Sequence, residues 1–114
     1  EGVAVSQETV RLRRRLTRHD YDAHAPGLAR ALCRLAIDLS ASGDLRDALA
    51  SAQESVDLYR SLARKRPEAF RQGLADTLGT YASVLEWVGK ESDASRIRQE
   101  SEDVTEQMAL KTSV

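Results

Sequence analysis

Residues 28–48 read LARALCRLAIDLSASGDLRDA, and residues 74–94, which lie 46 positions later, read LADTLGTYASVLEWVGKESDA. Leucine, alanine, glycine and aspartate recur at the same places in both stretches. The agreement extends along the chain in both directions. About a third of all positions paired by this shift are identical, several times more than a shuffled composition gives. The sequence is therefore an internal repeat with a period of 46 residues.

A glycine divides each period into two helices, Gly43 in the first period and Gly89 in the second. Before Gly43, apolar residues recur at the three- and four-residue spacing of a helix, and Pro26 is expected in the first turn of that helix. After Gly43, a second apolar helix extends as far as Pro67. The same pattern returns in the second period, so each repeat is predicted to be a helical hairpin.

The predicted fold class is all-α, an antiparallel helix-hairpin solenoid of about five helices in a single domain, residues 1–114. Its expected parts are the second helix of an incomplete repeat at 1–21, repeat 1 at 26–67 and repeat 2 at 68–110. The last helix is polar on its outer face, at Arg98, Glu102 and Thr105. An array of stacked repeats needs a polar surface where it ends, so this helix is expected to cap the C-terminal end.

Composition excludes several functional classes. The chain carries 17 basic and 18 acidic side chains, for a formal net charge of -1, which excludes binding of nucleic acid or an anionic membrane by bulk charge. No apolar run approaches the roughly 20 residues of a membrane-spanning helix. Cys33 is the only cysteine, so an internal disulfide and a cysteine zinc site are both excluded.

Few residues could carry chemistry. Residues 19–24, HDYDAH, contain two imidazoles and two carboxylates, but they align with the ordinary inter-repeat segment at residues 65–70. The arginines of residues 11–18 point in several directions on a helix, with no interleaved aromatic residues for base stacking. Phosphate-binding, dinucleotide-binding and nucleophile-elbow motifs do not occur. We expect no enzyme activity, no metal and no cofactor.

Small and large apolar residues at fixed places in each hairpin are similar to those of the tetratricopeptide repeat family. The matching positions are Leu32, Leu35, Ala36, Leu39, Gly43, Ala48 and Ala52 in repeat 1, and Leu78, Tyr81, Ala82, Leu85, Gly89 and Ala94 in repeat 2. The period exceeds the usual length of about 34 residues by about three helical turns shared between two helices. The sequence thus resembles the long-helix members, of kinesin-light-chain type and of multi-repeat bacterial regulators. It departs from the family at Ser55 and Ser101, where a late alanine is usual.

The resemblance implies a concave face lined by the first helix of each repeat, where a protein or peptide partner would bind. The residues that it assigns to this face are Arg30, Cys33, Arg34, Ile37 and Ala41 in repeat 1, and Asp76, Thr80, Ser83, Glu86 and Trp87 in repeat 2. The first group is basic and the second acidic, which favours a peptide of mixed charge. Trp87 either packs under the last helix or stands exposed as an anchor for a partner, since aromatic residues dominate binding hot spots.

The first helix lacks its pairing helix, so its apolar residues are expected to drive self-association through a homo-oligomer contact, or else to leave this helix frayed. These residues are Val3, Val5, Val10, Leu12 and Leu16. Burial of several hundred Å2 of such surface, at roughly 25 cal/mol per Å2, would supply several kcal/mol.

The function indicated by the resemblance is a protein–protein interaction scaffold within a larger protein, which we expect to be bacterial and cytoplasmic. Two alternatives remain open. The chain is either an oligomerisation or spacer unit with no peptide ligand, or a regulatory segment of a larger ATPase or signalling protein. No nucleic acid and no membrane is expected among its partners.

Overall fold

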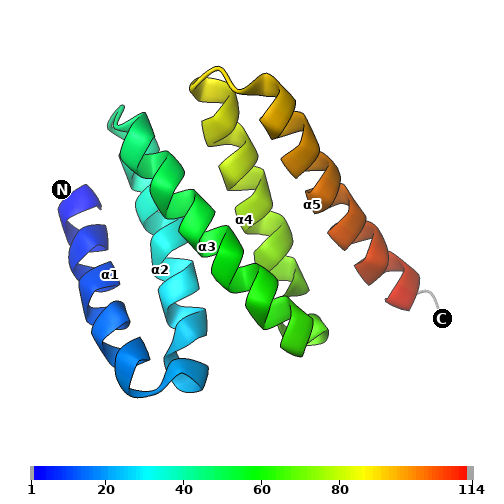
Figure 1. The fold of residues 1–114 in the computed structure, drawn as a ribbon, viewed down its shortest axis with the longest axis horizontal. Coiled ribbons are helices and arrows are strands. Elements are labelled where there is room, and N and C mark those ends of the chain that lie inside the picture. The colour runs from blue at the N-terminus through cyan, green and yellow to red at the C-terminus, as the bar shows by residue number, and fades with distance from the viewer. Residues whose placement is uncertain (1, 113–114) are drawn as a thin grey trace.

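The computed structural model describes residues 2–112, which form five helices and no strand (Figure 1). The helices are α1 (Gly2–His19), α2 (Tyr21–Ala41), α3 (Leu45–Lys65), α4 (Pro67–Trp87) and α5 (Glu91–Thr112). Successive helices are joined by very short turns and are antiparallel. The predicted all-α class of hairpins is confirmed. The expected domain bounds of 1–114 also include Glu1, Ser113 and Val114, which lie outside the described residues.

Helix α2 begins earlier than the sequence indicates. The expectation that Pro26 lies in its first turn is wrong, because the helix starts at Tyr21 and contains Pro26 in its second turn. Asp20 is the N-cap, and its side chain accepts a hydrogen bond from the backbone N–H of Ala23 at 3.3 Å. Proline deprives only the Asp22 carbonyl of its helical donor, and Asp22 is exposed to water.

Both expected glycine turns are present and have the same geometry. Gly43 and Gly89 have φ angles of 86° and 85°, in the left-handed region that glycine enters without steric cost. In each turn the backbone N–H of the residue after the glycine donates a hydrogen bond to a carbonyl in the last turn of the preceding helix. Asp44 donates to Leu39 at 2.9 Å, and Lys90 donates to Leu85 at 2.8 Å. The chain therefore reverses tightly and brings the two helices of each hairpin together.

The five helices form two layers in a body of 45 × 38 × 18 Å, whose thickness equals about two helix diameters. Each helix packs against its neighbours in the chain, and α2 also contacts α4 directly (Figure 1). No backbone position of α3 comes within 8 Å of α1 or α5. Helices α2 and α4 approach each other more closely than α1 approaches α3 or α3 approaches α5. The stack is therefore narrower on the α2–α4 side.

Several alanine residues are buried between the paired helices. Ala36 and Ala82 are fully buried, as are Ala48 and, to within 1%, Ala94. Leucines and valines fill the space beside them, with Leu32, Val56, Leu78 and Val84 at the centre. Protein interiors are packed at crystal density, so the absence of larger side chains at the alanine positions sets the distance between helices.

Two glycines near the starts of α2 and α4 allow a side chain of the preceding helix to lie against the backbone. A Cβ atom on Gly73 would come 2.5 Å from the Tyr59 ring, and one on Gly27 would come 2.9 Å from the Arg13 guanidinium. The two contacts are 46 residues apart, so the repeat is present in the packing as well as in the sequence.

None of the five helices contains an apolar stretch of the length that crossing a membrane requires, over the part of the chain that the structure describes.

We predict that Ala36→Leu or Ala82→Leu destabilises the fold by roughly 1–3 kcal/mol, because the added atoms overpack a close helix contact. Ala50→Leu makes the same change on the exposed face of α3 and serves as the control. Denaturant unfolding measures all three variants. Equal stability of the buried and exposed variants would contradict the assignment of these alanines to the helix contacts.

The glycines of α4 provide a second matched pair. We predict that Gly73→Ala is destabilising because of its clash with Tyr59, whereas Gly79→Ala stabilises by about 0.5–1 kcal/mol. A Cβ at Gly79 meets no atom within 4 Å, so only the lower backbone entropy of alanine acts there. Thermal unfolding should shift in opposite directions for the two variants, and shifts of the same sign would refute the close approach of Tyr59.

Candidate partner-binding groove

A groove of about 310 Å3 lies between the C-terminal halves of α2 and α4. Its lining comes from both helices and consists of Ile37, Ser40, Ala41, Thr80, Ser83, Val84 and Trp87. Five of the ten residues assigned to the concave face from sequence are among them, at Ile37, Ala41, Thr80, Ser83 and Trp87. The narrow α2–α4 side of the stack is thus also the side that carries this groove.

The groove is lined by apolar and hydroxyl-bearing side chains. Ser40 Oγ donates to the Ala36 carbonyl at 2.8 Å. Thr80 Oγ1 is oriented toward the Asp76 carbonyl, at a longer 3.4 Å. A hydroxyl that donates to its own helix keeps lone pairs that accept from another molecule. The groove therefore offers apolar contact area together with hydrogen-bond acceptors.

Trp87 stands exposed at the rim of the groove, with 60% of its surface accessible to solvent. Ile37, on the facing helix, is 43% exposed. Of the two sequence-based alternatives for Trp87, burial beneath α5 does not occur. An indole combines a large apolar area with one N–H donor, which suits it to contact with a partner.

The other five predicted concave-face residues lie outside the groove lining. Cys33 is nearest, with its Sγ 3.9 Å from Thr80 Oγ1. Glu86 accepts a hydrogen bond from Arg98 of α5 at 2.5 Å. Arg34 lies 3.6 Å from Asp38 and lines a different pocket, between α1 and α2.

The remaining two, Arg30 and Asp76, are exposed, and Asp76 accepts from Gln72 at 2.9 Å. Burial raises the pKa of the Tyr59 hydroxyl, and the positive charge of Arg30 partly offsets this rise. No charged side chain lines the groove itself. The lining therefore gives no support to the expected preference for a peptide of mixed charge.

The five apolar residues of α1 proposed for self-association do not share one open face. Val10 is buried against α2 and Val3 packs beside it. Val5 and Leu12 are exposed, at 67% and 51%, and Leu16 is half-buried. Positions five, twelve and sixteen fall on one side of a helix at 100° per residue. Only these three remain available for contact with another helix.

Two polar contacts that link the helices recur with the 46-residue period. Ser55 Oγ donates to the Ala29 carbonyl at 2.7 Å, and Ser101 Oγ donates to the Ala75 carbonyl at 3.0 Å. The serines that depart from the family's alanine pattern therefore hold the second helix of each hairpin against the first. Their recurrence at equal spacing was the signal in the sequence that could have revealed this bond.

The second recurring contact joins alternate helices. Arg14 of α1 makes a two-bond pair with Glu54 of α3, and Arg60 of α3 makes the same pair with Glu100 of α5. The distances in the second pair are 2.9 and 2.6 Å. These hydrogen bonds raise the pKa of both guanidinium groups. Identical Arg and Glu residues at the repeat spacing could have indicated the pairs in the sequence.

The arginines of α1 include two that are paired with carboxylates, Arg14 with Glu54 and Arg11 with Glu8 at 2.7 Å. Among residues 2–112, no three His, Cys, Asp or Glu side chains are grouped so as to hold a metal ion.

Comparison of the sequence with family models, with curated proteins and with solved structures gives no match. The resemblance to the tetratricopeptide repeat therefore rests on the residues of this chain.

Trp87 is the only tryptophan, so its fluorescence reports on the groove alone. Because the side chain is 60% exposed, we predict an emission maximum close to that of free indole in water and efficient quenching by iodide. Unfolding in denaturant should change the maximum little. A blue-shifted emission protected from iodide would show that Trp87 is covered in solution.

Proposed function

We propose that this chain is a long-helix tetratricopeptide-type module that binds a short segment of a protein partner in the groove between α2 and α4. By the same resemblance we propose a bacterial, cytoplasmic host protein with no catalytic role for this segment. The observation that carries the proposal is the pairing of exposed Trp87 with exposed Ile37 across a concave lining.

The chemistry of the lining supports a partner with an apolar anchor. Trp87 and Ile37 provide apolar contact, and the hydroxyls of Ser40 and Thr80 provide acceptors. An apolar side chain inserted between the helices would leave its own backbone N–H groups near those hydroxyls. Desolvated aromatic residues surrounded by such polar groups carry most of the energy of peptide recognition.

The charged residues at the margin are already engaged. Glu86 is paired with Arg98, and Asp76 accepts from Gln72. An exposed ion pair such as Glu86–Arg98 contributes little energy and mainly affects the association rate. We therefore propose that apolar fit, more than charge, selects the segment that binds.

Selection of short random peptides displayed on phage, with the wild-type chain as bait, tests the proposal. Selected peptides should share an aromatic or branched aliphatic residue, and their binding should change the emission of Trp87. Trp87→Ala should weaken binding by about 2 kcal/mol or more, the usual size for a hot spot. Since Trp87 is exposed, the variant should keep the stability of the wild type.

Leu12→Ala is the matched control, because it removes an exposed apolar side chain from α1, away from the groove. It should leave peptide affinity unchanged. Peptides that bind equally well to the Trp87→Ala variant, or a selection that enriches none, would reject the groove as a binding site and favour the spacer alternative.

A further inference from the structure

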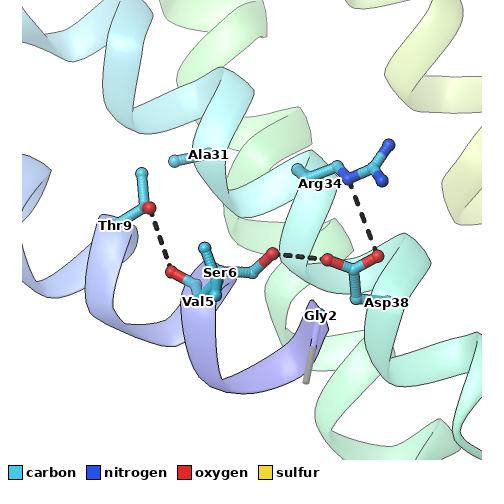
Figure 2. A pocket seen from close by; sticks show the side chains of 7 residues that line it. All are labelled: Gly2, Val5, Ser6, Thr9, Ala31, Arg34 and Asp38. Atoms are coloured by element: carbon cyan, nitrogen blue, oxygen red, sulfur yellow. Dashed lines mark hydrogen bonds and ion pairs between the residues drawn. The ribbon is translucent and has the colours of Figure 1, made fainter.

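A second groove, of about 380 Å3, lies between α1 and α2, at the end of the molecule away from α5. Figure 2 shows Val5, Ser6 and Thr9 of α1 beside Ala31, Arg34 and Asp38 of α2. This surface is separate from the partner-binding groove and has no part in the function proposed above.

The repeat identifies what this groove corresponds to. Shifted by one period, its residues become Ala48, Ala52, Ser55, Thr77 and Val84, together with Ser51 and Thr80. The first five are each no more than 2% exposed. They form the site between α3 and α4 in which α2 lies. Ser55 donates to the backbone of α2, and Val84 belongs to a core cluster with the leucines of α2.

We propose that the α1–α2 groove is a docking site for an amphipathic helix of the same type as α2. The partner helix carries leucines at the spacing of Leu28, Leu32, Leu35 and Leu39, and it lies on α1 and α2 as α2 lies on α3 and α4. The groove already has the small side chains that such close contact needs, since Gly2 and Ser6 stand where Ala48 and Ala52 do.

A hydroxyl is in place for the recurring bond between helices. Thr9 is one period before Ser55 and two before Ser101, both of which donate to a carbonyl of the pairing helix. In the structure Thr9 Oγ1 donates to the Val5 carbonyl of its own helix at 3.0 Å. A docked helix would supply the carbonyl that Ala29 supplies to Ser55.

One charged position distinguishes this groove from the site between α3 and α4. Asp38 occupies the place of Val84, and its side chain is only 15% exposed. It accepts a hydrogen bond from Ser6, with Arg34 3.6 Å away. A buried carboxylate requires hydrogen-bond donors. Ser6 and Arg34 already supply them, so a docked helix need not provide a donor to Asp38.

Charge argues against a second copy stacked end to end. In the pairs between alternate helices, the arginine at position 14 or 60 meets a glutamate at 54 or 100. Glu8 of α1 is one period before Glu54, so α1 offers a glutamate for such a pair. One period after Arg60, however, α5 has Glu106 in place of the arginine that the pair requires. Copies stacked through α5 and α1 would bring two carboxylates together, which is unfavourable. The occupant is thus a separate helix and not the far end of another molecule.

The probe is a peptide of residues 21–41 with Cys33→Ser, labelled with a fluorophore and titrated with the full chain. We expect saturable binding, with amide shifts at Val5, Thr9 and Ala31. Val5→Lys should weaken binding at least about tenfold, because the longer charged side chain would occupy the groove and would lose hydration when a helix docks over it. Ala4→Lys, the control at an exposed position of α1 that does not line the groove, should bind as the wild type does.

A tethered form removes the dependence on peptide affinity. Residues 21–47 are placed directly before Gly2, where the repeat register would put them, again with Cys33→Ser in the added copy. The melting temperature should rise, Val5→Lys should abolish the rise, and Ala4→Lys should not. The proposal is overturned if the tethered chain melts no higher than the wild type. It is also overturned if the wild-type chain is itself a dimer that Val5→Lys dissociates, because a second copy would then be the occupant.

Discussion

Close contact between helices, at alanine and serine positions repeated every 46 residues, is the constraint on which this structure depends. Where Ala36, Ala48, Ala82 and Ala94 are buried, the helices of a hairpin can approach until Ser55 and Ser101 reach the backbone of the pairing helix. A buried hydroxyl without a partner would cost more than a methyl group in the same place. The two serines are therefore compatible only with this separation and rotation of the helices, and they fix how each hairpin closes.

The groove follows from the same geometry. Because α2 and α4 are in direct contact, the residues on the inner side of these helices converge, and Ile37 and Trp87 line a shared hollow. Helices α1, α3 and α5 make no backbone contact with one another. They are connected instead by ion pairs between the long side chains of arginine and glutamate. One layer thus provides the concave surface, while the other maintains the spacing of the hairpins.

The sequence was sufficient to predict what depends on local chemistry and on period. Gly43 and Gly89 are at the turns because a left-handed residue closes each first helix, and the buried alanines could be placed by register alone. The start of α2 could not be placed, because the capping carboxylate of Asp20 outweighs the usual preference of Pro26 for a first turn.

The open face of α1 was also described inaccurately by pattern. Val3 and Val10 pack against α2, while Val5 and Leu12 do not. Apolar spacing shows that a helix has buried surface but does not separate two faces that contact different neighbours. For the groove, five lining residues followed from the family register. Ser40 and Val84 did not, because that register assigns other positions of the helices to the concave surface.

The Arg14–Glu54 and Arg60–Glu100 pairs give the two layers different elasticity. The α2–α4 layer is held by packed side chains, which resist compression and separation over tenths of an ångström. The other layer is held by flexible, partly solvated ion pairs, which can lengthen or exchange with water at little energetic cost. The stack should thus bend mainly by changes in the spacing of α1, α3 and α5, while the spacing of α2 and α4 stays constant. Added salt screens the ion pairs and should make the stack easier to bend without weakening the packing within each hairpin.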